Sequence, residues 1–596
     1  MCGIVGYSGK KNAAPVLLEG LRRLEYRGYD SAGIAINTKK GIRSVKVKGK
    51  VAGLEEKLLE KPVVGSCGIA HTRWATHGKP SVRNAHPFRY NSFAIVHNGI
   101  IENWKTLKDD LIKAGYNFTS DTDTEVALIC FCALFEKTQS IGKAILQLVK
   151  MLKGAYAFLI IDEQNPSTII GVKNGNPLVV GKNADDIIAA SDLTALLSFT
   201  NRAFFLEDRQ FFVAGDGNID FYNFEGGKIS NTPVDVKWNQ EEAKKGGYKH
   251  YLLKEIMEQP AALTRALAGR VDNLLFDELK NRITPKGRII CIACGTSYNA
   301  ALCFKYFINM LSGVSVTVEF ASEFRYQPHD LSADSLVIAL SQSGETSDTK
   351  EALLRAKNSG AHTVAIVNSW ESSIARAADE TIYMNIGQEI SVASTKAYTA
   401  EVALLYLVAL RIASERGAAA EKIDAWKQKI KEVPKIQSNY LENSGSVEDI
   451  AKKYYKKKNF FYIGRGIGYP VAIEGALKLK ELSYMHAECY ASGEMKHGPI
   501  SLIDSEFPTI AVAPPGGLRD KLFSNVSEIK SRMGQVILVS DSMLAGCDFI
   551  KMPKIDAWLS PFVYILPLQL FSYYAANLLG NDVDQPRNLA KSVTVE

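Results

Sequence analysis

A cysteine directly follows the first methionine of the chain, and it is the first residue that could act as a nucleophile. A thiol reacts well near neutral pH only when a base lies close to it. If Met1 is removed, the new α-amino group of Cys2 can serve as that base, because its ordinary pKa is about 7.7–8.0. The small Cys2 side chain permits this removal. A cysteine at position 2 usually has no function, so its interpretation depends on the rest of the chain.

Five short motifs in the first part of the chain could serve such a nucleophile. They are Cys2–Gly6 (CGIVG), Leu24–Ser31 (LEYRGYDS), His71–Gly78 (HTRWATHG), His97–Gly99 (HNG) and Ser120–Glu125 (SDTDTE). In this set and order they resemble the class II glutamine amidotransferases, whose glutaminase domain is an N-terminal-nucleophile hydrolase. The resemblance implies that Cys2 attacks glutamine and that Trp74 and His77 lie against the substrate.

The same resemblance assigns a partner to each polar group of glutamine. Arg73 would clamp the carboxylate in a bidentate pair, and Asp123 would bind the α-ammonium. Asn98 and the backbone N–H of Gly99 would donate to the tetrahedral oxyanion, and glycine would permit the close approach. Taken singly, these residues could instead form a surface ion pair, a helix cap and a hairpin turn. The five motifs together favour the functional interpretation.

A metal site is the alternative for the histidines in this part of the chain, which are His71, His77, His86 and His97. Their spacing matches no zinc signature, and no pair of cysteines joins them. Cys291 and Cys294 form a CxxC, but they lie at the end of a predicted strand, where core and loop positions explain them better than a redox pair. We therefore expect no metal and no cofactor.

Two loops rich in serine and threonine could bind an anion, namely Cys294–Ser297 (CGTS) and Ser341–Thr346 (SQSGET). Each follows a predicted strand and precedes a predicted helix. Hydroxyls, backbone N–H groups and a helix N-terminus can bind phosphate without a P-loop lysine. Serine and threonine are also favoured as helix N-caps, which is the alternative for either loop alone. Two such loops in one sheet favour phosphate binding.

Further motifs extend the resemblance over essentially the whole chain. The two loops resemble sugar isomerase (SIS) domains, which bind phosphosugars. The other motifs are Ser391–Lys396 (SVASTK), Glu474–Glu481 (EGALKLKE), Gly493–Pro499 (GEMKHGP) and Leu589–Glu596 (LAKSVTVE). Together they are similar to the bacterial type of the glutamine–fructose-6-phosphate aminotransferase (isomerizing) family. The resemblance implies synthesis of glucosamine 6-phosphate from glutamine and fructose 6-phosphate, and a homodimer formed through the sugar domains.

The resemblance also implies roles in the sugar reaction. Lys591 would form a Schiff base with the sugar carbonyl, which ammonia then displaces, and His497 would open the sugar ring. Glu481 would move a proton between C1 and C2, and Lys478, on the same helix face, would stabilise the developing oxyanion. Singly, Lys478 and Glu481 could be an ordinary i,i+3 pair, and Lys591 a solvated tail residue. The expected phosphate and sugar contacts are Thr296, Ser297, Ser341, Gln342, Ser343, Thr346, Val392 and Ser394.

These residues need two kinds of scaffold. Up to about Trp238, short apolar runs alternate with turns, and helical patterns occur at 14–24 and 125–135. The resemblance implies an αββα sandwich here.

From about Tyr251, strands alternate with helices, which predicts a parallel α/β sheet. Residues 288–307 parallel 459–478 in pattern, so we expect two copies of one doubly wound unit. The expected domains are 2–238 (glutaminase), 239–250 (linker), 251–435 and 436–580 (SIS subdomains) and 581–596 (active-site tail).

The composition is that of a globular protein, with 46% hydrophobic and 23% charged residues and a net charge of +7 over 596 residues. No run of lysine and arginine suggests a nucleic-acid arm.

Nine cysteines without paired spacings favour a reducing compartment. The N-terminus does not read as a signal peptide. The apolar segment Trp558–Gly580 carries prolines and polar residues, so a buried helix is the better prediction than a membrane span. We expect a cytoplasmic protein that binds neither nucleic acid nor membrane.

Two other functions stay open. Another class II amidotransferase would need an ATP or ribosyl-diphosphate loop, and the sequence has neither a GxxxxGK[ST] motif nor an acidic ribosyl-diphosphate loop. A non-catalytic phosphosugar-binding regulator would have no reason to carry Glu481, His497 and Lys591 together.

Overall fold

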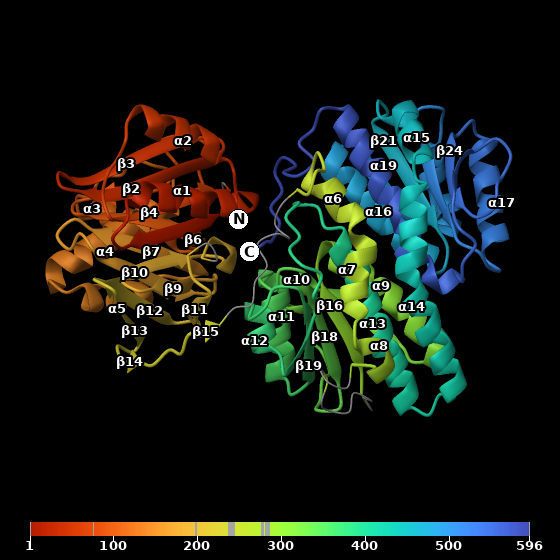
Figure 1. Ribbon diagram of the computed structural model, residues 1–596, viewed down its shortest axis with the longest axis horizontal. Coiled ribbons are helices and arrows are strands. Elements are labelled where there is room, and N and C mark those ends of the chain that lie inside the picture. Colours follow the sequence, from red (N-terminus) through yellow and green to blue (C-terminus); the bar gives the residue numbers. More distant parts are fainter. Residues whose placement is uncertain are drawn as a thin grey trace. The chain divides into compact units, whose positions relative to one another are not determined.

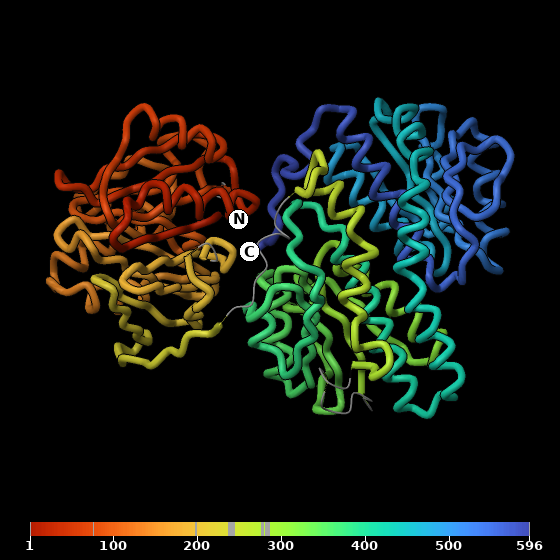
Figure 2. Tube along the Cα trace, viewed as in Figure 1, coloured from red at the N-terminus to blue at the C-terminus, as the bar shows by residue number. Residues whose placement is uncertain are grey.

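The computed structural model describes residues 2–74, 77–196, 199–235, 245–275, 279 and 287–594. Predictions that involve Met1, Ala75, Thr76, linker residues 239–244 or Val595–Glu596 lie outside these described residues. The chain divides into two compact units, one comprising Met1–Gln240 and Ser592–Glu596 and the other Glu241–Lys591, which can be followed by colour along the trace in Figure 2.

Two antiparallel sheets form the first unit (Figure 1). The eight-stranded sheet has the order β15 (Val234–Asp235), β11 (Arg202–Phe205), β9 (Val179–Asn183), β10 (Asp186–Ala190), β1 (Gly3–Ser8), β4 (Cys67–Arg73), β2 (Ser31–Thr38) and β3 (Gly41–Lys48). The seven-stranded sheet has the order β14 (Lys228–Ile229), β13 (Asn218–Asn223), β12 (Gln210–Gly215), β8 (Ile169–Asn174), β7 (Tyr156–Asp162), β6 (Phe93–Gly99) and β5 (Phe88–Tyr90).

Helices cover the outer face of each sheet, so the first unit has four layers. α1 (Ala13–Leu24) and α2 (Val51–Glu60) pack on the eight-stranded sheet, and α3 (Trp104–Lys113), α4 (Asp123–Thr138) and α5 (Ile141–Met151) pack on the seven-stranded sheet. A separate core lies between the sheets. In β1, Ile4 belongs to that core whereas Val5 and Tyr7 face the helices, as the two-residue period of a strand requires. This arrangement confirms the predicted αββα sandwich.

Two five-stranded parallel sheets form the second unit, and they have the same strand order. The first has the order β17 (Val316–Phe320), β16 (Ile289–Ala293), β18 (Leu336–Ser341), β19 (His362–Val367) and β20 (Glu380–Tyr383). The second has the order β22 (His486–Ala491), β21 (Asn459–Gly464), β23 (Thr509–Ala513), β24 (Val536–Ser540) and β25 (Asp548–Lys551). The predicted duplication of a doubly wound unit is therefore confirmed.

The two copies share one large apolar core. Its helices include α9 (Gly295–Ser312), α13 (Lys396–Glu415), α16 (Gly468–Ser483), α18 (Ser560–Val563) and α19 (Ile565–Leu578). The other helices are α6 (Tyr251–Met257), α7 (Gln259–Leu267), α8 (Arg270–Asn273), α10 (Ala321–Phe324), α11 (Ser347–Asn358), α12 (Ser373–Ala377), α14 (Ala420–Glu442), α15 (Ser446–Tyr454) and α17 (Arg519–Lys530). α9 and α16, which follow the equivalent strands β16 and β21, pack against each other and join the copies.

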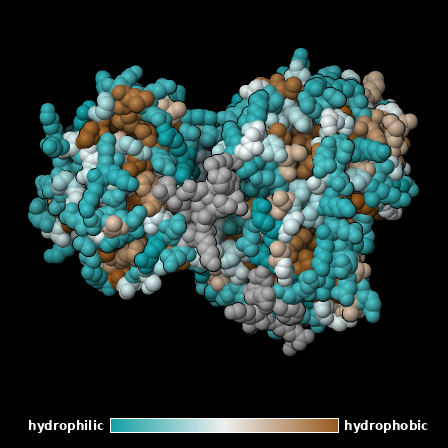
Figure 3. Space-filling model, viewed as in Figure 1, coloured by the Kyte–Doolittle hydropathy of each residue, from teal (hydrophilic) through white to brown (hydrophobic). Residues whose placement is uncertain are grey.

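One helix of the described chain, α13, is long and apolar enough to cross a membrane by length and composition. Its apolar window is 94% buried within the unit, so the core explains its composition. The segment Trp558–Gly580 folds as α18 and α19 and is largely buried, as predicted. The face of the molecule in Figure 3 is mainly hydrophilic, with hydrophobic residues scattered between polar ones.

Candidate active sites

Cys2 lies directly before β1, beside the end of β4. The two strands are antiparallel with Gly3 opposite Thr72, and this register brings Cys2 to the loop that follows Arg73. The Cys2 thiol lies 3.5 Å from the Trp74 carbonyl oxygen, and the Trp74 N–H donates to Cys2 Sγ over 3.4 Å. Burial raises the pKa of the Cys2 thiol, so the thiol is protonated at neutral pH and needs a base to react.

The end of β6 places Asn98 and Gly99 next to Cys2. Asn98 Nδ2 donates to the Cys2 carbonyl oxygen over 2.8 Å, and the Asn98 carbonyl accepts from Asn176 Nδ2 over 2.9 Å. Gly99 has φ +135°, and a Cβ at this position would collide with the Ala155 carbonyl oxygen. Only glycine fits this backbone without strain. The structure thus brings together three of the residues predicted for glutamine chemistry.

Arg73 and Asp123 are both 3% exposed and lie within electrostatic range of Cys2. Arg73 Nη2 donates to the carbonyl oxygens of His77 and Gly78. Arg73 Nη1 is buried and has no hydrogen-bond partner among the described residues. Asp123 Oδ2 accepts from the Ile101 N–H over 2.9 Å. The guanidinium therefore has a donor available for an anionic group beside the thiol.

Three of the four histidines form a buried network beneath this site. His71 and His86 stack with ring centroids 3.9 Å apart, and Thr124 Oγ1 lies 2.8 Å from His86 Nε2 and 3.0 Å from His97 Nδ1. Burial lowers the pKa of all three, that of His97 to about 4, so their rings are neutral at physiological pH. His77 lies apart from them, edge-on to the Trp104 ring.

The described residues contain no group of three or more His, Cys, Asp and Glu side chains that could hold a metal ion. All nine cysteines are free. Cys291 is buried in β16 and Cys294 precedes α9, and burial raises the pKa of both thiols. They occupy the core and loop positions expected for them.

The two predicted anion loops lie at the same edge of the first parallel sheet. β16 and β18 are neighbours in the sheet, so their carboxyl ends lead together into α9 and into the loop before α11. Thr296 and Ser297 stand in the first turn of α9. In the other loop, Ser341 Oγ accepts from the Gly344 N–H and lies 3.0 Å from Thr346 Oγ1. Two hydroxyl-bearing loops thus converge, as predicted.

Two hydrogen bonds hold the rest of the SQSGET loop. The Glu345 N–H donates to Ser343 Oγ within the loop over 3.2 Å, and the Asn368 N–H donates to the Gln342 carbonyl oxygen over 3.0 Å. The second bond fixes the loop next to the end of β19, which is the neighbour of β18 in the sheet. The backbone contacts leave the side chain of Gln342 half-buried at the site.

A charged network joins the equivalent helices α9 and α16. Lys478 Nζ lies 2.6 Å from Glu481, 3.3 Å from Glu474 and 2.9 Å from Thr296 Oγ1. Glu474 is fully buried and accepts from Thr296 and Asn299. Burial alone would lower the pKa of Lys478, but the two carboxylates outweigh it and raise that pKa. Lys478 is therefore a fixed, buried cation next to Glu481.

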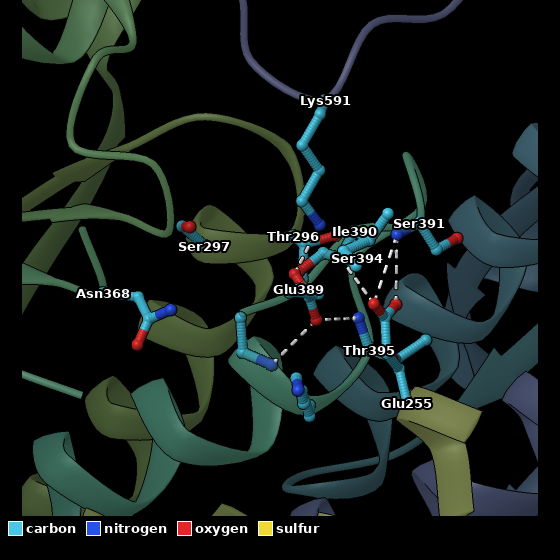
Figure 4. A network of polar contacts seen from close by, with 12 residues as sticks. Glu255, Thr296, Ser297, Asn368, Glu389, Ile390, Ser391, Ser394, Thr395 and Lys591 are labelled. Carbon is cyan, nitrogen blue, oxygen red and sulfur yellow. Dashed lines mark hydrogen bonds and ion pairs between the residues drawn. The ribbon is translucent and has the colours of Figure 1, made fainter. Parts of the chain in front are cut away.

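Lys591 points from the C-terminal segment toward Glu389 (Figure 4). Its ammonium lies 2.5 Å from Glu389 Oε2, which also accepts from Ser394 Oγ. Glu389 Oε1 accepts from the backbone N–H groups of Thr395 and Ala397. The predicted tail lysine is thus buried in a polar network and is no solvated residue.

Backbone bonds fix the segment before α13 around this pair. Glu255 accepts from the Ile390 and Ser391 N–H groups (Figure 4). The Val392 N–H donates over 3.0 Å to the carbonyl oxygen of Asp584. Ser394 therefore lies beside Lys591, because both side chains bind the same oxygen of Glu389, whereas Val392 contacts the backbone of the C-terminal segment at Asp584.

His497 is the predicted residue that the structure does not bring to this cluster. It is exposed in the 3-10 turn Ser492–His497 after β22. No hydrogen bond or ion pair between described residues joins it to Lys591, Glu389 or Lys478. Its predicted role has no geometric support from within this chain.

The sequence matches two domain families. The glutamine amidotransferase domain family matches residues 71–198, and the SIS domain family matches residues 282–411 and 453–579. A glutamine–fructose-6-phosphate aminotransferase (isomerizing) from Aquifex aeolicus is 45% identical over 603 residues, covering 100% of both chains. The chain belongs to the glutamine–fructose-6-phosphate aminotransferase (isomerizing) family.

Other members of this family are similarly close, such as the Acinetobacter baylyi protein, which is 44% identical over 616 residues. A solved C-terminal domain of glucosamine-fructose-6-phosphate aminotransferase from Francisella tularensis has 37% identity and a TM-score of 0.54, and covers 58% of this chain and 100% of that domain. Tagatose-6-phosphate ketose/aldose isomerase from Escherichia coli, at 19% identity and a TM-score of 0.50, shares the fold of the second unit.

Sequence inspection missed several buried carboxyl groups of the second unit, namely Glu255, Glu389, Glu401 and Glu474. Only Glu474 could have been found from the sequence, by its spacing from two predicted site residues. Glu474 stands four residues before Lys478 and seven before Glu481, so the three share a helix face. The other three are ordinary glutamates in sequence, and only their burial marks them as members of the site.

Proposed function

We propose that this chain makes glucosamine 6-phosphate and glutamate from fructose 6-phosphate and glutamine, the first step of the UDP-N-acetylglucosamine pathway. The observation that carries the proposal is the whole-length likeness to relatives of that name. The thiol site of the first unit and the lysine–carboxylate network of the second unit supply suitable chemical groups for the two half-reactions.

In the first unit, Cys2 Sγ attacks the side-chain amide carbon of glutamine, with the α-amino group of the processed Cys2 as base. Arg73 and Asp123 hold the carboxylate and the ammonium of glutamine, and Asn98 and the Gly99 N–H donate to the oxyanion. The C–N bond then breaks, the leaving ammonia takes the proton, and water releases glutamate from the thioester. Removal of Met1 is part of this proposal.

In the second unit, His497 opens the ring of fructose 6-phosphate and Lys591 forms a Schiff base with the carbonyl, releasing water. Ammonia displaces Lys591, and Glu481 moves a proton from C1 to C2 to give the aldose. Lys478 stabilises the negative oxygen that develops. The phosphate and hydroxyl contacts are Thr296, Ser297, Ser341, Gln342, Ser343, Thr346, Val392 and Ser394.

The remaining features of the proposal follow from the family. Trp74 and His77 contact glutamine. The reaction uses no metal and no cofactor, the protein is a cytoplasmic homodimer formed through the sugar domains, and it binds neither nucleic acid nor membrane. The domains are 2–238, 251–435 and 436–580, with a linker at 239–250 and a tail at 581–596.

Incubation of the purified chain with both substrates tests the proposal, with glutamate and hexosamine phosphate measured separately. Both products are expected in equal amounts. Glutamate without hexosamine phosphate would point to another amidotransferase, and phosphosugar binding without turnover would point to a regulator. Cys2→Ala is expected to lose glutamine use and keep phosphosugar isomerisation, whereas Cys547→Ala, a half-buried thiol of the second unit, should keep both.

A further inference from the structure

Glu401 is a carboxyl group of the second unit that the proposed mechanism does not use. It lies on α13, is fully buried (0% exposed) and faces α9, where Ser297 Oγ lies 2.7 Å from Glu401 Oε1. Glu401 Oε2 is also buried and has no hydrogen-bond partner among the described residues. Because Ser297 is one of the proposed phosphate contacts, any role of Glu401 there rests on the proposed function.

This geometry favours the neutral acid, and Glu389 provides the contrast within the same unit. Both oxygens of Glu389 accept hydrogen bonds, and one of them pairs with the Lys591 ammonium. Within the described ranges, Glu401 has a single hydroxyl as its hydrogen-bond partner. Burying an ionised oxygen without a donor is costly, whereas an unpaired carbonyl-type oxygen of a neutral acid costs less. In agreement, burial raises the pKa of Glu401 to about 8.

Three charged groups face Glu401 from neighbouring segments. Glu389, before α13, and Glu474, on α16, raise the pKa of Glu401 further, whereas Lys591 lowers it. The Ser297 hydroxyl, from α9, also favours the charged form. A phosphate dianion at the start of α9 would add negative charge next to Glu401 and favour the neutral acid more strongly.

The hydroxyl groups of Thr296 and Ser297 in α9 can bind the phosphate only if they have a proton to donate to it. A serine has one O–H to donate, and a phosphate dianion only accepts. If Glu401 were ionised, Ser297 would donate to it and have no proton left for the phosphate. The Thr296 hydroxyl cannot supply this proton instead of Ser297, because it accepts from Lys478 Nζ and already donates its own proton to Glu474 over 3.0 Å.

We infer that Glu401 is a positioning residue of the phosphosugar site: as a neutral acid it donates its proton to Ser297 Oγ, which leaves the Ser297 hydroxyl free to donate to the sugar phosphate. Loss of the Glu401 proton then competes with binding in two ways. It turns the Ser297 hydroxyl away from the phosphate, and it places the negative charge of the Glu401 carboxylate beside that of the phosphate.

Calorimetric titration of the full chain with fructose 6-phosphate, without glutamine and between pH 7 and 9.5, tests this inference. The sugar phosphate is a dianion over most of that range, because its second pKa is about 6. For the wild-type chain the Kd should rise above pH 8 and approach a tenfold increase per pH unit, with proton uptake on binding seen by varying the buffer. Glu401→Gln donates an amide N–H to Ser297 at every pH, so its Kd should stay flat over the same range.

Two further variants complete the experiment. Glu401→Ala lacks any donor and should bind weakly at every pH, after circular dichroism has shown that it folds. Glu421→Gln removes an exposed carboxylate on α14 and should keep the wild-type profile. A wild-type profile that Glu401→Gln leaves unchanged would overturn the inference. Absence of fructose 6-phosphate binding at every pH, in both chains, would instead overturn the proposed function and this role with it.

Discussion

Lys591 Nζ lies 2.5 Å from Glu389 Oε2, and the two side chains are only 3% and 0% exposed. Burial opposes the charge on Glu389, but Lys591 and two backbone N–H groups more than compensate and lower the pKa of Glu389 to about 2. Glu389 is therefore ionised and forms a buried ion pair with Lys591. The proposed Schiff base needs the neutral amine of Lys591. The charge of Lys591 is the largest cause of the lowered Glu389 pKa, so this pKa rises as Lys591 gives up its proton, and Glu389 is positioned to receive that proton.

Glu389→Gln is expected to lower both isomerisation and hexosamine phosphate synthesis by about 100- to 10,000-fold, the usual effect of removing a positioned proton acceptor. Release of glutamate from glutamine alone should be retained, since that site lies in the first unit. Separate assays of the three activities check this. Asp272→Asn, which removes the exposed partner of Lys431, is the matched control and should leave all three unchanged. Full isomerisation by Glu389→Gln would exclude the proton-acceptor role.

Arg73→Lys should raise the KM for glutamine by roughly 10- to 100-fold, because a lysine cannot supply the bidentate pair that a carboxylate accepts. Arg73 Nη1, which has no hydrogen-bond partner within the described part of the chain, is the donor expected to be lost. Kinetics with varied glutamine at saturating fructose 6-phosphate measure the effect. Arg22→Lys changes an exposed arginine paired with Glu55 and should leave the KM unaltered. An unchanged KM in Arg73→Lys would remove Arg73 from the glutamine site.

Gly99→Ala should abolish glutamine use and destabilise the first unit by about 1–3 kcal/mol. The φ of +135° is unfavourable for alanine, and the added methyl group would push β6 away from Ala155. Glutaminase assays and urea unfolding measure both effects. Gly142→Ala in α5, where a Cβ meets nothing within 4 Å, should be neutral or slightly stabilising. A Gly99→Ala chain with normal glutaminase activity would contradict the need for this backbone conformation.

Asp192→Asn should destabilise the first unit by about 3–5 kcal/mol at pH 7, because it removes a carboxylate that pairs with the buried Arg27. Burial opposes the charge on Asp192, but Arg27 and nearby donors lower its pKa below the ordinary value of 3.8. The stabilisation is therefore fully present above the ordinary pKa and is lost as the pH falls through the lowered pKa. Urea unfolding at pH 7 and pH 3 should show the difference from wild type shrinking in acid. Glu55→Gln, in an exposed pair, should cost at most about 1 kcal/mol at either pH.

The element types of both units were predictable because they depend on local patterns. Alternating apolar residues marked the strands, and the repeated strand–turn–helix pattern at 288–307 and 459–478 marked the two copies. Boundaries were less accurate. The helix predicted at 125–135 begins at Asp123, because Thr122 caps it by accepting from the Glu125 N–H. A cap depends on side-chain geometry that periodicity does not report.

The predicted glutamine site was recognisable because its residues fall in short motifs, and the strand register only had to bring the motifs together. The sugar site was predictable in part. Thr296 and Ser297 were assigned to the phosphate, but the structure engages them with Glu474 and Glu401. His497 was assigned to the ring opening, and the structure leaves it exposed.

By itself, the sequence determined the order of the motifs, the duplicated sheet and the family, and it predicted the nucleophile. Only the tertiary structure decided which charged side chains contact each other and which buried carboxyl groups are ionised. Lys591 and Glu389 are 202 residues apart in the chain, and Thr296 and Glu474 are 178 apart. The charge state of a carboxyl group depends on its burial and on the donors around it. Those are properties of packing, which is why Glu389 is an anion and Glu401 a neutral acid although both are plain glutamates in sequence.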